Sequence, residues 1–150
     1  MASSTNHQEQ RVLKVLAHAP SELVSSSFEA LRDVPDWEFI RQPEAGLVMV
    51  RGRISGTGAP FNVGEVTVTR AAVTTASGET GFSYALGRDK KKAEQAAIIH
   101  ALWRQPQRQS AVESEIIEPL EQALAQQENQ VREEVASTKV DFFTMVRGDD

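Results

Sequence analysis

The 150-residue sequence predicts a single α+β domain, with an antiparallel sheet of about four strands packed with helices and a C-terminal arm. Three observations carry this prediction. Apolar and polar residues alternate within residues 37–86, apolar residues recur at helical spacing on both sides of this stretch, and an apolar segment follows the last helical pattern. We place the domain at residues 1–138 and the arm, a docking element, at residues 139–150.

The N-terminal part of the chain predicts two helices. Residues 1–8 are polar and we expect them to be loosely ordered, whereas the apolar cluster at residues 12–16 begins a first helix. Ser21 suits the N-cap of a second helix, because its hydroxyl can accept a hydrogen bond from a free backbone N–H group. Pro35 ends this region, because proline cannot continue a helix.

The middle of the chain predicts the sheet. Residues 37–54 are expected to form two strands separated by a turn at residues 44–46. Residues 63–75 are rich in Val and Thr and predict a third strand, and residues 80–86 predict a fourth. Ser77-Gly78 is typical of a hairpin turn between them. Because all the connections are short, the strands are expected to form an antiparallel meander.

A buried helix is predicted after the last strand. Asp89 is expected to be its N-cap, and the helix should run to about Gln105. Its apolar residues lie nearly all round between Ala96 and Trp103, which is typical of a helix that is covered on several sides. Pro106 ends it, and we expect the helix to pack on the sheet and partly on other helices.

The last predicted helix is long and rich in Glu and Gln. The spacing from Ser110 to Glu113 matches a capping box at its start. An apolar stripe at helical spacing continues as far as Val135. Pro119 lies inside this pattern and is expected to kink or split the helix.

Composition excludes several kinds of protein. The chain contains no cysteine, which excludes disulfides, thiolate metal sites and iron–sulfur ligation within it. Its formal net charge is −5, whereas a general nucleic-acid binder is usually basic. The polar N-terminus lacks the features of a signal peptide, and no apolar run reaches the roughly 20 residues of a membrane span. We therefore expect a cytoplasmic protein that binds neither nucleic acid nor membrane and carries no cofactor of its own.

The residue pattern contains no catalytic constellation. The histidines His7, His18 and His100 have no metal-ligand spacing, so each is expected to be a surface residue or a hydrogen-bonded core residue. No serine lies in a nucleophile elbow. We therefore assign no catalytic residue and no metal ligand to this chain.

The segment from Gly87 to Lys92 breaks a local rule of helix chemistry. Its three lysines fall in the first turn of the predicted helix, where the helix dipole disfavours cations. Free backbone N–H groups together with Arg88 and Lys90 would suit a phosphate group or an acidic protein surface. A solvated run of charge explains the pattern equally well, so the residues alone leave both interpretations open.

The C-terminal segment is apolar where a chain end is usually polar. Phe142, Phe143, Met145 and Val146 follow a Glu-rich helix, and exposed they would form an aggregation-prone patch. They must therefore be buried. Packing on their own domain and insertion into another subunit are equally compatible with the pattern, although Phe, Met and Arg are typical of interfaces.

A set of short motifs spans nearly the whole chain in a fixed order. They are Val15-Leu16-Ala17-His18, Gly46-Leu47-Val48, Gly56-Thr57-Gly58, Thr69-Arg70-Ala71-Ala72-Val73, Gly87-Arg88-Asp89-Lys90 with Ala93-Glu94, and the final segment from Val140 to Asp149, which is the most specific. This ordered set resembles the PhnG family, a subunit of the bacterial carbon–phosphorus lyase core complex for phosphonate use.

The resemblance implies a function in organic phosphonate catabolism. Such subunits act with partners to make α-D-ribose 1-methylphosphonate 5-triphosphate from ATP and methylphosphonate with release of adenine. The expected partners are PhnH, PhnI and PhnJ, with PhnK and PhnL as further candidates. In that family the nucleosidase-like chemistry is assigned mainly to PhnI, and the radical cleavage of the carbon–phosphorus bond to the iron–sulfur subunit PhnJ. The resemblance therefore implies an assembly or accessory subunit of a transferase complex, not catalytic in isolation.

The resemblance also weights the candidate residues. Lys91 and Lys92 are not part of the family pattern, so Arg88 and Lys90 are the expected phosphate-binding positions. The C-terminal segment is expected to dock, with Phe142, Phe143, Met145 and Arg147 as partner-binding residues. Two alternatives are kept: a direct contribution of phosphate-binding residues to a composite active site, and a free-standing regulatory binding module.

Overall fold

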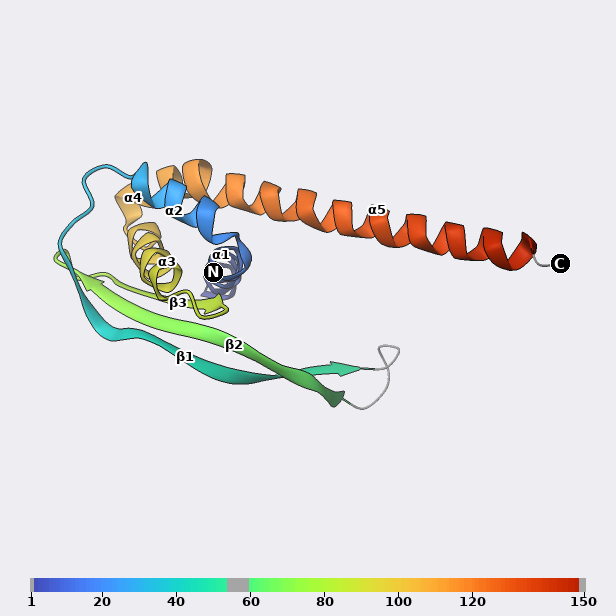
Figure 1. The fold of residues 1–150 in the computed structure, drawn as a ribbon. Coiled ribbons are helices and arrows are strands. Elements are labelled where there is room, and N and C mark those ends of the chain that lie inside the picture. The colour runs from blue at the N-terminus through green and yellow to red at the C-terminus, as the bar shows by residue number, and fades with distance from the viewer. Residues whose placement is uncertain (1, 54–59, 149–150) are drawn as a thin grey trace.

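The computed structural model describes the backbone of residues 2–53 and 60–148, and the side chains within residues 6–49 and 64–134. Two helices precede a sheet, and further helices follow it, with the helices on one face of the sheet (Figure 1). The elements in order are α1 (Ala2–His18), α2 (Ser21–Glu29), β1 (Trp37–Arg53), β2 (Pro60–Thr75), β3 (Thr80–Leu86), α3 (Lys90–Trp103), α4 (Pro106–Val112), a π-helical turn η1 (Glu113–Ile117) and α5 (Glu118–Gly148).

The α+β class and the antiparallel meander are confirmed, but the described residues form three strands instead of about four. Their order is β1-β2-β3, and each neighbouring pair is antiparallel. The turn expected at residues 44–46 is wrong, because β1 passes through this region as one strand. Its pairing register with β2 shifts between Phe39 and Arg41 and again between Arg41 and Glu44. One extra residue of β1 is accommodated at each of these shifts, whereas Glu44, Ala45 and Gly46 pair in regular register with Arg70, Thr69 and Val68.

The helix ends differ from the expectations at three places. Residues 1–8 were expected to be loosely ordered, but α1 begins at Ala2. Pro20, and not Ser21, is the N-cap of α2, since Ser21 is already its first residue. Ser110 does not start the long helix, because α4 begins at Pro106, where the missing N–H of proline costs nothing in the first turn.

Proline also explains the π-helical turn. Pro119 is the second residue of α5, and the turn from Glu113 to Ile117 lies directly before it. Proline cannot donate a backbone hydrogen bond and its ring crowds the preceding turn, so the helix must widen or break there. The expected split at Pro119 therefore takes the form of a π-helical turn between α4 and α5. No helix within the described ranges is long and apolar enough to cross a membrane.

Helix α3 is buried on nearly all sides, as its composition predicts. Its residues from Ala96 to Trp103 all belong to the core, which also receives apolar side chains from α1, α2, β2 and the turn before α5. The largest fully buried members are Leu16, Ile98, Ile99, Leu102 and Ile117. Burial of each such side chain contributes about 1.5–3 kcal/mol, so α3 is the centre of the fold.

Gly81 sets how closely α3 approaches the sheet. A Cβ atom added to this glycine would overlap the carbonyl oxygen of Ala97 and would lie 2.8 Å from the Cβ of Ala101. The strand and the helix therefore meet backbone to backbone. Ser83, two residues along β3, donates from Oγ to the carbonyl oxygen of Ala93 at 2.6 Å, which fixes the other end of the same contact.

A buried polar cluster closes the free edge of β3. The Nδ1 atom of His100 accepts a hydrogen bond from the backbone N–H of Phe82 at 2.9 Å, so Nε2 carries the ring proton and donates it to Glu9 at 2.9 Å. Arg104 also binds Glu9, and it donates to the carbonyl oxygen of Thr80 at 3.1 Å. His100 is thus a hydrogen-bonded core histidine, one of the two alternatives expected for it.

The environment of His100 lowers its pKa to about 4, because burial disfavours the charged ring and Arg104 repels it, while the charge and the hydrogen bond of Glu9 only partly offset these effects. The folded state therefore keeps a neutral imidazole at pH values where an unfolded histidine, with a pKa of about 6.5, already binds a proton.

The first prediction concerns the contact between α3 and β3. Replacing Gly81 by Ala should lower the free energy of unfolding by roughly 1–3 kcal/mol or more, because the added methyl group overlaps backbone atoms of α3. Gly46→Ala is the control, since a Cβ atom there meets nothing within 4 Å. Urea unfolding of both variants measures the difference, and equal stability of the two would contradict the role of Gly81.

The second prediction concerns pH. The free energy of unfolding should fall as the pH drops below about 6.5 toward 4, with a slope approaching 1.4 kcal/mol per pH unit from His100 alone. His100→Asn keeps an acceptor for the Phe82 N–H and should flatten this slope between pH 7.5 and 5. A wild-type slope that His100→Asn does not alter would contradict the assignment.

Candidate functional site

The N-terminus of α3 carries the cations that the sequence assigned to phosphate binding. Asp89 is the N-cap as predicted, and its carboxylate accepts from the backbone N–H of Lys92 at 3.0 Å. This hydrogen bond, with a second one from Ser21, lowers the pKa of Asp89. Arg88 and Lys90 lie on either side of Asp89 and are both exposed. The structure therefore places the two predicted residues together at one open corner of the domain.

Lys92 has a different role from its neighbours. Its side chain is buried, and Nζ donates to the carbonyl oxygen of Ala17, near the end of α1, at 2.9 Å. Burial lowers the pKa of this lysine, partly offset by the charge of Asp89. Lys92 therefore joins α3 to α1, and the three successive lysines do not act as one anion-binding cluster. This use of a lysine in a first helical turn has no local signal in the sequence.

His100 is not accessible to a substrate, because its side chain is fully buried and enclosed by α1, β3 and α3. No group of three or more His, Asp or Glu side chains within the described ranges is arranged to hold a metal ion. The exposed corner at Arg88 and Lys90 can attract an anion, and the Asp89 carboxylate between them accepts a hydrogen bond from the backbone N–H of Lys92.

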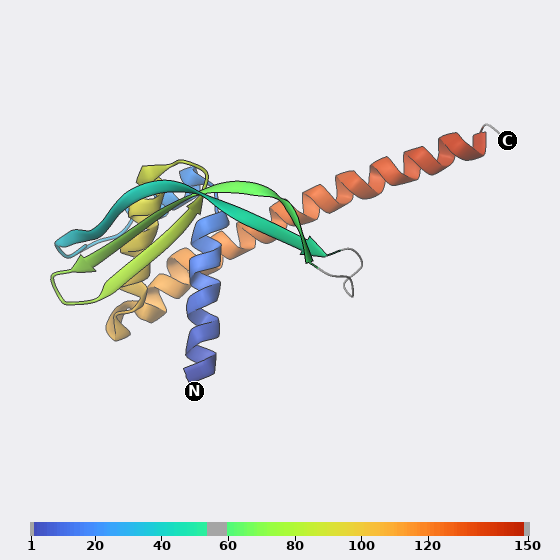
Figure 2. The ribbon, with the colours of Figure 1, turned by 90° about the horizontal axis from the view of Figure 1, so that it is seen from below.

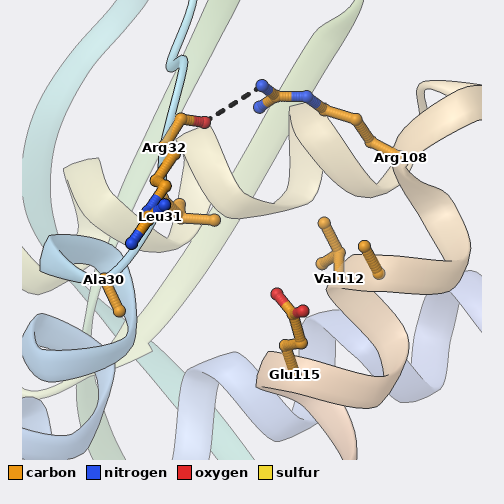
Figure 3. A pocket seen from close by; sticks show the side chains of 7 residues that line it. Ala30, Leu31, Arg32, Arg108, Val112 and Glu115 are labelled. Atoms are coloured by element: carbon orange, nitrogen blue, oxygen red, sulfur yellow. Dashed lines mark hydrogen bonds between the residues drawn. The ribbon is translucent and has the colours of Figure 1, made fainter.

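A pocket of about 490 Å³ lies between the end of α2 and α4 (Figure 3). Its apolar floor includes Leu31 and Val112, and Glu115 of the π-helical turn stands at its rim. The Arg108 guanidinium lies at the opposite rim, where it donates to the carbonyl oxygens of Arg32 and Asp33 at 3.0 and 2.6 Å. Arg108 of α4 thus holds the segment that follows α2. The pocket lies between that segment and α4.

Two strands extend beyond the rest of the sheet as a ribbon, which we call the β-ribbon (residues 44–53 and 60–67). β3 ends at Leu86, opposite Val68, so β1 and β2 continue without a third strand (Figures 1 and 2). Leu47 and Met49 on this ribbon are 65% and 52% exposed, and Val66 is exposed as well. By register Leu47 and Met49 share one face with Thr67 and Glu65, and Val66 lies on the other, so among the described residues each face of the β-ribbon has an exposed apolar side chain.

Helix α5 forms the second projection. It continues from the domain to Gly148 as a single helix that extends to the same side as the β-ribbon (Figures 1 and 2). The predicted partner-binding residues Phe142, Phe143, Met145 and Arg147 fall in its last part. Their backbone is helical, but their side chains lie outside the residues that the structure describes.

A groove between α1 and the first turns of α5, here called the α1–α5 groove, has a volume of about 950 Å³. Arg11 fixes its inner end: the guanidinium donates to both carboxylate oxygens of Glu113 at 3.0 Å and to Glu121 at 2.9 Å. Burial alone would raise the pKa of Glu113, but the hydrogen bonds from Arg11 and Trp103 outweigh it and lower that pKa. Sequence reasoning found neither this groove nor the β-ribbon, because both depend on where elements end relative to each other.

Comparison with known proteins assigns the family. A family model described as phosphonate metabolism protein PhnG matches residues 7–148. A protein of Rhizobium meliloti (strain 1021), named α-D-ribose 1-methylphosphonate 5-triphosphate synthase subunit PhnG, is 43% identical to this chain over 143 residues. That alignment covers 95% of this chain and 91% of the relative. Because both matches run through the domain and through α5, the chain belongs to the PhnG family of phosphonate metabolism proteins.

Proposed function

We propose that this chain is an assembly subunit of a multisubunit transferase that makes α-D-ribose 1-methylphosphonate 5-triphosphate. The reaction of the complex takes ATP and methylphosphonate and releases adenine. Support comes from a relative that is 43% identical to this chain and is named as a subunit of this synthase. The partner subunits that we expect are PhnH, PhnI and PhnJ, with PhnK and PhnL as further candidates. The chain is proposed to work in the cytoplasm.

One structural observation carries the assembly role. Helix α5 runs out from the domain as a lone helix, beside a two-stranded ribbon with exposed apolar side chains on each face (Figure 1). A lone helix in water gains little from hydrogen bonding alone, because most helical stability in proteins comes from packing an apolar face. Both projections are therefore suited to be covered by another subunit.

We place the functional boundary at Thr138, with residues 1–138 as the folded domain and residues 139–150 as a docking arm. Phe142, Phe143 and Met145 supply apolar anchors of the kind enriched at interface centres, and Arg147 supplies a multidentate donor. All of the buried core described above lies before this boundary, so removal of the arm should not affect folding of the domain.

The third prediction tests this arm. A chain that ends at Thr138 should unfold at the same temperature as the full chain within about 2 °C, but it should fail to co-purify with its co-expressed partner subunits. The control is Arg88→Ala with Lys90→Ala, which changes exposed residues elsewhere and should leave assembly intact. Co-purification of the truncated chain in normal yield would remove the docking arm from the proposal.

A second function has a specific observation in its favour. Arg88 and Lys90 are exposed and flank the N-cap Asp89 of a 14-residue helix. Lys92 in the same stretch is instead buried against Ala17. Exposed cations beside free helical N–H groups are suited to hold phosphate. These two residues would then line part of a composite active site and bind the triphosphate of the substrate or product.

The fourth prediction tests that contribution. Arg88→Ala with Lys90→Ala should leave the complex assembled but lower kcat/KM of the synthase reaction roughly tenfold or more, since one charge-assisted hydrogen bond contributes about 1.5–3 kcal/mol. Lys91→Ala, the exposed neighbour, is the matched control and should have a smaller effect. Unchanged kinetics of the double variant would reject phosphate binding at this corner and leave the assembly role untouched.

A further inference from the structure

The α1–α5 groove is formed by two helix faces. From α1 it receives Arg11, Lys14, Val15 and His18, and from α5 it receives residues at positions 121, 124, 125, 127, 128, 131 and 132. The α5 positions other than 127 are spaced by three, four and seven residues, as on one helix face. The groove follows α5 from Glu121 to Arg132, which is about 16 Å at 1.5 Å per residue, or three turns of a facing helix.

The floor of the groove is apolar and incompletely covered. Val15 is buried and Leu124 is half-buried. Val131 lies two helical turns beyond Leu124 along α5 and is 55% exposed. The axes of α1 and α5 diverge (Figure 2), and the groove between them is lined on the α5 side as far as Val131 and Arg132.

The charges of the groove are unequal. At its inner end Arg11 pairs with both Glu121 and Glu113. Lys14 and Arg132 line its two walls, and within the described ranges neither side chain has a hydrogen bond or an ion pair. Glu128 is the one carboxylate that lines the groove beside these two cations, so this part of the groove has one more cation than carboxylates. A helix that enters the groove is best matched if it carries carboxylates beside its apolar face.

We propose that the α1–α5 groove receives an amphipathic helix of a partner subunit, with carboxylates placed to pair with Lys14 and Arg132. The distal part of α5 from a second copy fits less well, because residues 135–148 contain Lys139 and Arg147 against the single acid Asp141. This inference rests on the proposed assembly function and adds a second contact, independent of the docking arm.

Photo-crosslinking in the assembled complex tests the occupant. The chain, with p-benzoylphenylalanine in place of Val131, is co-expressed with its partner subunits, and the purified complex is irradiated. The crosslinked peptide should come from a helix of a partner subunit that contains Asp or Glu. Position 129, two residues away and pointing off the groove face, is the control and should give several-fold less product. A crosslink to a second copy of this chain, a peptide without carboxylates, or no crosslink from an intact complex would overturn the inference.

Charge reversal tests the pairing. Lys14→Glu with Arg132→Glu should weaken partner binding roughly tenfold and reduce its dependence on salt, because attraction at the groove is replaced by repulsion. Arg32→Glu with Lys91→Glu makes the same change of net charge at exposed residues outside the groove and should bind like wild type. Equal binding of the two double variants would overturn the inference. Failure of even the wild-type chain to assemble with partners would instead reject the proposed function.

Discussion

The fold depends on how closely α3 lies against β3. At Gly81 the strand and the helix meet through backbone atoms, with Ala97 and Ala101 on the helix side. Small residues at this contact let the two elements approach closely, and the large side chains of α3 can then fill the space toward α1, α2 and α5. Every other layer of the domain is built outward from this contact, since α3 touches all of them.

The same contact determines how the sheet edge is protected. An edge strand presents unpaired N–H and C=O groups that can recruit another strand. On β3 two of these groups, the N–H of Phe82 and the carbonyl of Thr80, are bound by His100 and Arg104 of α3, and Glu9 of α1 binds both side chains. The start of the short strand β3 is thereby protected at its outer edge, whereas β1 and β2 extend past its end.

Sequence reasoning succeeded where a local pattern matched the final environment. The all-round apolar composition of α3, its N-cap at Asp89 and the hairpin at Ser77-Gly78 each have a short-range cause, and all appear in the structure. It failed where a long-range partner changed the outcome. Residues 44–46, which were expected to form a turn, are extended because they pair with β2. The Lys92 side chain points into the domain because its ammonium group donates to the carbonyl oxygen of Ala17.

The candidate surfaces were predictable to different degrees. Arg88 and Lys90 stand out because cations in a first helical turn break a propensity rule. The α1–α5 groove gives no such signal: its residues lie about 110 positions apart in the chain, and they come together through core packing and through Arg11, which joins α1 to Glu113 and Glu121. Surfaces of this kind follow from tertiary packing and cannot be derived from periodicity alone.

The β-ribbon has a consequence for the life of the chain before assembly. A ribbon with exposed apolar side chains on each face and unpaired outer strand edges is prone to strand pairing with further copies. If a partner subunit covers the β-ribbon as proposed, a copy without that partner exposes these side chains to solvent. We expect such a surplus copy to aggregate or to be proteolysed more readily than a copy in a complex.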